Sequence, residues 1–171
     1  MSSFTAHDTL EGEDDTPGRE FSSPSCSMHE ADNCYIGFLG TGEVVEALNE
    51  LLEIERAAVW ITLESGHAAG RGPMAETMRS IQRDEERCCS MLRAHIEALG
   101  GSPAATMGAF YETAKTIGDL RSRLAFLNRG QEWVVRKLRG LLPRLRDDRL
   151  HADLRAMLRA HETNIVRAQG L

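Results

Sequence analysis

Apolar residues recur three and four positions apart along four segments of the chain, which predicts four amphipathic helices. The first covers about residues 41–65, with Thr41 as its N-terminal cap and a stop at Ser65 and Gly66. The second covers about residues 74–99 and ends at a Gly-Gly-Ser-Pro sequence. Its inward positions alternate steps of four and three without a slip: Met74, Met78, Ile81, Glu85, Cys88, Leu92, His95 and Leu99.

The second half of the chain predicts another pair of helices. We expect the third over about residues 112–141 as one continuous element, closed by Gly140 and Pro143. Asp147 or Asp148 then caps the fourth, whose apolar positions begin at Leu150. Together the four segments predict an all-α fold, an antiparallel four-helix bundle that occupies residues 36–171.

Residues 1–35 have a different composition, rich in Ser, Thr, Asp, Glu, Gly and Pro and poor in large apolar groups. Such a segment buries too little to offset the entropy lost on ordering, so we expect it to be mostly disordered or extended. It contains Cys26, His29 and Cys34, whose side chains form a weak candidate for an N-terminal metal site.

Charge and composition exclude several kinds of partner. The formal net charge is −6 with a pI of about 5.5, which argues against nucleic acid. No stretch is long and apolar enough for a membrane span, and no secretory signal opens the chain, so a cytoplasmic location is expected. In that compartment the four cysteines, Cys26, Cys34, Cys88 and Cys89, are expected as thiols or metal ligands rather than as structural disulfides.

Each predicted helix carries one polar residue in the middle of its apolar face. These residues are Glu55, Glu85, Gln131 and His161. At about 1.5 Å rise per residue, Glu55 and Glu85 lie at the same level of their hairpin, and Gln131 and His161 match likewise. Because a buried carboxylate without a partner costs several kcal/mol, one such layer favours a metal ion or a proton-sharing network.

Cys88 follows Glu85 by three positions, so both side chains point to the same side of the helix. A histidine at that spacing is usual in di-iron bundles. A thiol is a softer ligand, which suits zinc, copper or redox chemistry at least as well as iron.

Three segments, residues 48–57, 84–87 and 161–165, resemble the ferritin-like superfamily. Over about residues 23–171 the likeness is to an uncharacterised bacterial branch, distant from rubrerythrin and ferritin. The resemblance implies carboxylates on the first and third helices and Glu-x-x-His pairs on the second and fourth. It also implies a long crossover between the second and third helices. Residues 100–111 barely span that distance, so an up-down-up-down topology is the alternative.

The resemblance transfers residue by residue. Glu55 and Glu85 take the first two carboxylate positions, and Cys88 replaces the first histidine. Gln131 replaces the third-helix carboxylate, unless Glu132, one step off the seam, supplies it. On the fourth helix His161 points inward, Glu162 lies at the edge, and no Glu-x-x-His occurs. These departures favour a single metal or a degenerate site over a di-iron centre.

Two functions follow from these observations. The first is metal-dependent redox chemistry or metal handling, with iron, manganese, zinc or copper as the ion and a small oxidant as substrate. The second is a non-enzymatic helical interaction module, for which a homodimer is one assembly, whose buried polar residues only set the helix register. The sequence does not decide whether the protein is an enzyme.

Overall fold

The computed structural model describes residues 37–171, which form five α-helices and one 3₁₀ helix. The predictions for Cys26, His29 and Cys34, and for a disordered segment, lie outside the described residues. Among the described helices none is long and apolar enough to cross a membrane.

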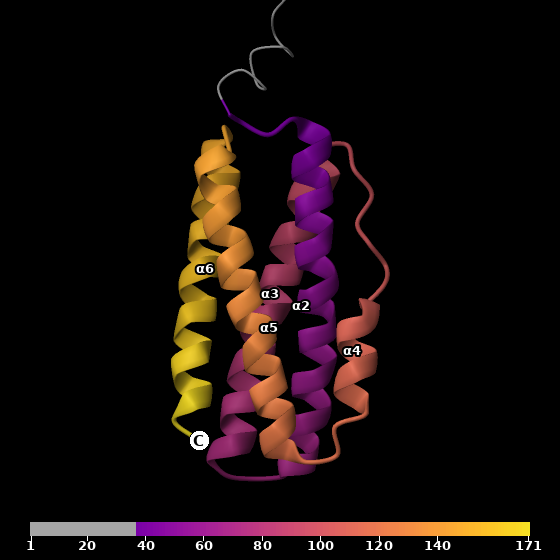
Figure 1. Ribbon diagram of the computed structural model, residues 1–171, viewed down its shortest axis with the longest axis vertical. Coiled ribbons are helices and arrows are strands. Elements are labelled where there is room, and N and C mark those ends of the chain that lie inside the picture. The colour runs from indigo at the N-terminus through magenta and orange to yellow at the C-terminus, as the bar shows by residue number, and fades with distance from the viewer. Residues whose placement is uncertain (1–36) are drawn as a thin grey trace, which may run out of the picture.

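Four long helices lie side by side: α2 (Thr41–Ala69), α3 (Pro73–Ala98), α5 (Leu120–Leu141) and α6 (Asp148–Gln169). Helices α2 and α3 form one hairpin and α5 and α6 the other, while α2 also packs on α5 and α3 on α6. Neighbouring helices run in opposite directions, whereas α3 and α5, which lie diagonally, run in the same direction (Figure 1).

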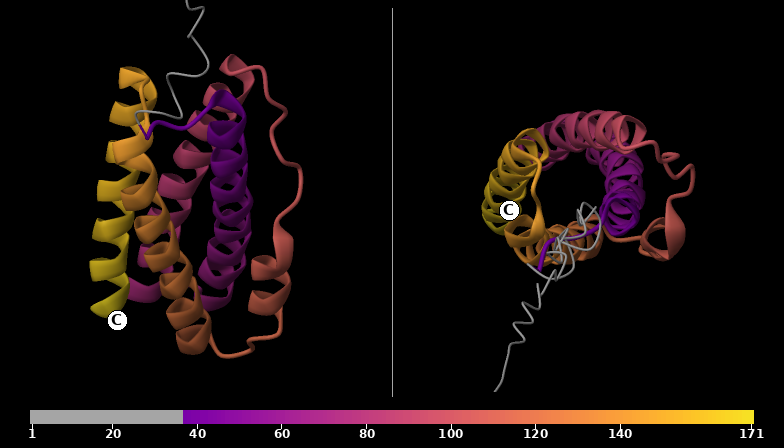
Figure 2. Two further views of the ribbon diagram at one scale, coloured as in Figure 1. Left: turned by 45° about the horizontal axis from the view of Figure 1, so that its top comes forward. Right: turned by 90° about the horizontal axis from the view of Figure 1, so that it is seen from above.

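A long connection joins α3 to α5 and returns the chain along the outside of the molecule. It contains the short helix α4 (Gly108–Lys115), which lies beside α2 and outside the ring of long helices (Figure 2). Asn49 of α2 holds it at two points, since its amide nitrogen donates to Ser102 O at 3.2 Å and its oxygen accepts from Ala104 N at 2.7 Å. The connection is therefore a crossover, as the resemblance implied.

The prediction of one continuous third helix is wrong. Helix α4 ends at Lys115 and α5 begins only at Leu120, because Gly118 disfavours helix and Asp119 caps the new one. The Asp119 carboxylate accepts a hydrogen bond from Ser122 N at 2.7 Å.

Other helix ends differ in detail from the prediction. Thr41 is the first helical residue rather than the cap, and Glu43 accepts a hydrogen bond from Gly40 N. Helix α2 continues past Ser65 to Ala69, because Ser65 and Gly66 are buried against α3 rather than free to turn. Of the two predicted caps of α6, Asp147 is the one observed, and its carboxylate accepts a hydrogen bond from Leu150 N.

The buried apolar side chains form two clusters, one toward each end of the long helices. One cluster contains Leu48, Leu92, Leu138 and Leu154, and the other contains Ile61, Met78, Ile81 and Leu127. The inward polar residues of the four helices lie between these clusters. The fold thus encloses a polar layer between two apolar clusters.

Candidate metal centre

The four polar residues predicted to point inward are buried. Glu55 and Glu85 are 0% exposed, His161 1% and Gln131 3%. They lie one on each long helix and contact one another across the interior. We call these residues the polar layer. Because buried polar groups must be hydrogen-bonded or bound to an ion, the contacts within the layer determine its chemistry.

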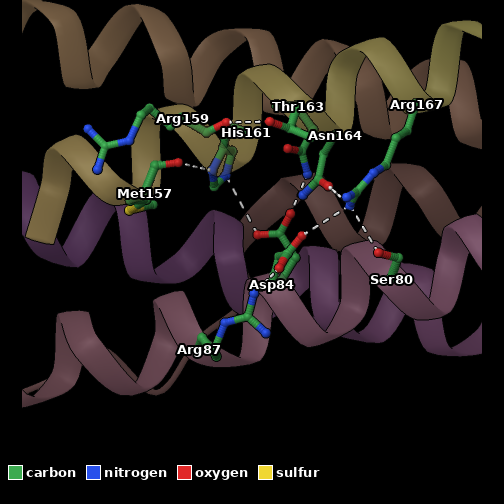
Figure 3. Close-up of polar contacts among 11 residues, drawn as sticks. Ser80, Asp84, Arg87, Met157, Arg159, His161, Thr163, Asn164 and Arg167 are labelled. Atoms are coloured by element: carbon green, nitrogen blue, oxygen red, sulfur yellow. Dashed lines mark hydrogen bonds and ion pairs between the residues drawn. The ribbon is translucent and has the colours of Figure 1, made fainter.

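His161 has a fixed orientation. Its Nδ1 lies 3.0 Å from the carbonyl oxygen of Met157, one turn earlier on α6 (Figure 3). That carbonyl only accepts, so Nδ1 carries a proton and Nε2 faces the carboxylates. Nε2 lies 3.0 Å from Glu55 Oε1 and 3.6 Å from Glu85 Oε2. An imidazole held this way presents Nε2 either as a donor or as a metal ligand.

The two carboxyl groups are incompletely satisfied. Gln131 donates its Nε2 to Glu85 Oε1. As ionised carboxylates, Glu55 and Glu85 each retain one buried oxygen, Oε2, without a hydrogen-bond donor. A proton on Glu85 resolves this in part, because it lets Glu85 donate to Glu55. Orphaned oxygens at the centre of an apolar interior are the atoms that a cation would satisfy.

Burial and mutual charge move the pKa values of the layer apart. Burial, followed by the negative charge of Glu55, raises the pKa of Glu85 well above its usual range. Burial also raises the pKa of Glu55, but His161 and the hydrogen bonds to Glu55 outweigh it, so the net direction is downward. Burial lowers the pKa of His161, yet Glu55 reverses this and raises it overall. Of the two carboxyl groups, Glu55 therefore ionises first, and Glu85 holds its proton to higher pH.

Cys88 completes a group that could hold a metal ion. One ligand atom each from Glu55, Cys88 and His161 lies within 4.8 Å of the other two, and all three residues are buried. Burial, then the charges of Glu55 and Glu85, raises the pKa of the Cys88 thiol, so it is protonated at neutral pH. A metal that uses this sulfur must therefore displace its proton.

The remaining candidate ligands lie apart from this group. Glu162 pairs with Arg139 at 2.7 Å on a partly exposed face. Glu132 is half-buried and does not belong to the group of close ligand atoms among the described residues. Cys89 is also half-buried, and burial raises its pKa to about 12.

Sequence reasoning missed Phe110, which covers the layer from the side of α2 and α5. Its ring lies against Gly130 so closely that a β-carbon there would come within 2.4 Å of Phe110 Cζ. Phe110, Glu55, Gln131 and His161 line a space with no room for a water molecule. A glycine inside a helix, directly before the inward Gln131, was the available signal of a close approach.

Sequence reasoning also missed the role of Asp84, the residue before Glu85. Asp84 lies at the rim of the layer, where Arg87 pairs with one carboxylate oxygen and Arg167 approaches the other at 3.7 Å (Figure 3). Arg167 also donates to Ser80 Oγ at 3.0 Å and to Asn164 Oδ1 at 3.3 Å. This network closes the seam between α3 and α6 beside the layer.

Fold and site together define an all-helical protein in which a buried Glu/Cys/His group could hold a metal ion. The chain belongs to the family described as Domain of unknown function (DUF6306), whose family model matches residues 42–170. That range contains the whole polar layer and Cys88. No curated protein and no solved structure matches the chain.

Proposed function

We propose that the four long helices form a ferritin-like four-helix bundle. Three features support this: antiparallel neighbours, one long crossover between the second and third long helices, and a polar layer at mid-height. The short helix α4 is part of the crossover rather than a fifth member of the bundle. The departures from the ferritin-like ligand pattern are then changes at the site and not in the fold.

We propose that the layer binds a single divalent transition-metal ion and serves in metal handling or metal-dependent redox chemistry. The observation that carries the proposal is the convergence of Glu55, Cys88 and His161, with ligand atoms within 4.8 Å of one another in a buried position. Glu85, next to His161, is the fourth group in reach and carries a proton that the ion replaces.

Charge balance favours such an ion. Ionised Glu55, Glu85 and Cys88 carry three negative charges and neutral His161 adds none, so a divalent cation cancels two of the three. One nitrogen, one sulfur and one or two oxygen ligands suit zinc or ferrous iron better than the all-oxygen surroundings that magnesium prefers. Gln131, bonded to Glu85, would orient that carboxyl group.

The closed interior limits the substrate. The space among Glu55, Gln131, His161 and Phe110 has no room for a water molecule, so on this side an organic substrate cannot reach the ion without large rearrangement. Oxygen, peroxide or the metal itself is small enough to arrive after side-chain movement. This class of substrate fits the redox or metal-handling role.

The deciding experiment is anaerobic titration with Co²⁺, whose spectrum reports a thiolate ligand. The wild type is expected to bind one ion per chain and to show sulfur-to-cobalt charge transfer, while His161→Ala and Glu55→Gln lose the ion. His151→Ala, on the same helix but outside the layer, serves as the control. Cys88→Ser is expected to abolish the charge-transfer band. Full binding by both His161→Ala and Glu55→Gln would contradict the proposal.

A second function has one observation in its favour. The layer is partly satisfied by its own contacts, since His161 pairs with Glu55 and Gln131 bonds to Glu85. A module that uses these contacts only to fix helix register would bind no metal. In that case replacing Glu55 and Gln131 with Leu is tolerated or stabilising, and nothing but the polar network is lost.

A further inference from the structure

A groove of about 270 Å³ runs along the seam between α3 and α6, on the side of the layer away from Phe110. Three sulfur-containing residues line it, Cys88 and Met91 from α3 and Met157 from α6. We call it the sulfur groove. Ala156 and Ala160 line the same wall as Met157, and their small side chains leave the groove open.

The sulfur groove reaches from the surface to the layer. A neighbouring hollow of about 390 Å³ shares Met91 and Asp153 with it and extends it along the same seam. At its inner end lies Cys88, which is 6% exposed and whose sulfur also belongs to the buried group with Glu55 and His161. Cys88 thus belongs both to the lining of the groove and to the buried group.

The charged residues of the groove are already paired with protein groups. Asp84 pairs with Arg87 and Arg167. Asp153 Oδ2 lies 2.8 Å from His95 Nε2 and accepts a hydrogen bond from it. The Cys88 thiol also hydrogen-bonds to Glu55, and the two thioethers belong to uncharged side chains. A thiol and two thioethers are soft, polarisable ligands that select monovalent copper over hard divalent cations.

We propose that the sulfur groove is a second metal site, which takes monovalent copper through Cys88, Met91 and Met157. The three residues come from two helices, α3 and α6, that face each other across the groove. The copper site stands on the groove alone. Its further role, as the access point to the buried group through the shared sulfur of Cys88, rests on the metal centre proposed above.

The test is the Cu⁺ affinity of the full chain, measured anaerobically against a chromogenic Cu⁺ chelator. All proteins carry Cys26→Ser and Cys34→Ser, so that thiols of the N-terminal segment do not compete. The Met91→Leu/Met157→Leu variant keeps the volume and removes both thioethers, and it leaves the Met157 carbonyl that orients His161. Met78→Leu is the matched control, since Met78 is a buried methionine of α3 outside the groove.

The double variant is expected to bind Cu⁺ about tenfold more weakly or worse, with Met78→Leu unchanged. Unchanged Cu⁺ affinity in the double variant, or an equal loss in Met78→Leu, overturns the copper site. Co²⁺ titration of the same proteins separates the two proposals, because neither methionine belongs to the buried group. A wild type that binds Cu⁺ through the methionines but takes no Co²⁺ supports the sulfur groove and removes its role as an access point.

Discussion

The protonation of Glu85 determines what the polar layer costs the metal-free protein. Two carboxyl groups share a site whose Phe110 side has no room for water, and among residues 37–171 the ionisable base within 4 Å of both is His161. One of the two must therefore remain neutral, and the raised pKa of Glu85 identifies it. The same proton is released when a metal binds, so metal affinity and pH are linked.

The metal-free protein is expected to lose stability as the pH rises from about 5 to about 8. The pKa of Glu85 lies above its unfolded value of 4.5 and that of His161 above 6.5, so their contributions to stability are full below those values and are lost as each group gives up its proton in the folded protein. The pKa of Glu55 is lowered, so its contribution to stability has the opposite pH dependence. It is present above about pH 4.5 and is lost as the pH falls further. Urea unfolding with a chelator present measures the free energy at each pH.

Glu85→Gln should flatten the lower part of this pH dependence, because the amide cannot ionise. Glu86→Gln, an exposed change one residue later, is the control and should leave the curve unchanged. A wild-type stability that rises between about pH 5 and about pH 8 would contradict the assigned protonation states.

Gln131 is predicted to tune the metal without holding it. Gln131→Leu removes the hydrogen bond to Glu85 and should weaken Co²⁺ binding by about 10- to 100-fold while preserving the thiolate band. Isothermal titration and absorption spectra measure the two effects. Loss of the band would instead place Gln131 among the direct ligands.

The inward positions of Glu55, Glu85, Gln131 and His161 were predictable, because helical periodicity alone determines which face of an amphipathic helix is buried. The orientation of Glu162 was not predictable in this way. A side chain at the edge of the apolar face is oriented by the partner it binds, which here is Arg139. Whether the layer holds an ion stays a prediction. Periodicity places side chains, but it does not measure their affinity.

Helix α4 is the element that the sequence pattern concealed. Its apolar residues continue the spacing of α5, so the two appear as one helix until Gly118 and the Asp119 cap separate them. The separation lets Phe110 fold back onto α5, where it stacks on Phe126 with ring centroids 4.6 Å apart. The break between α4 and α5 therefore allows Phe110 to cover the polar layer.

Gly130→Ala is expected to destabilise the protein by about 1–3 kcal/mol, because the added methyl group meets the Phe110 ring. Gly140→Ala, on the same helix with nothing within 4 Å, should be neutral or stabilising by up to about 1 kcal/mol. Thermal and urea unfolding measure both. If Gly130→Ala behaved like Gly140→Ala, Phe110 would not be held against α5.

At the scale of the whole molecule, the crossover is fastened to the outer face of α2. Asn49 holds the segment before α4, Glu53 accepts from Thr106, and Glu64 accepts from the Tyr111 hydroxyl at 2.9 Å. The polar face of α2 therefore contacts protein along much of its length. Chain length alone did not predict the topology, because the break before α5 lengthens the connection beyond residues 100–111.

Asn49→Ala is expected to loosen the crossover at a cost of about 1–2 kcal/mol, since it removes two hydrogen bonds to the backbone. Hydrogen exchange should then accelerate in residues 102–107 while α3 stays protected. Glu46→Ala, an exposed change on the same helix, is the control. Equal exchange in both variants would show that Asn49 does not fasten the segment.

The layer takes Glu55 and Glu85, with Cys88, from the first hairpin, and Gln131 and His161 from the second. Neither hairpin alone offers both the acidic and the imidazole ligand, so an ion bound here would cross-link the two hairpins. The hairpins are linked covalently only by the crossover. If the chain were cleaved within the crossover, the two hairpins would associate more strongly as the free metal concentration rises. The metal would then control the assembly of the protein from two separate fragments.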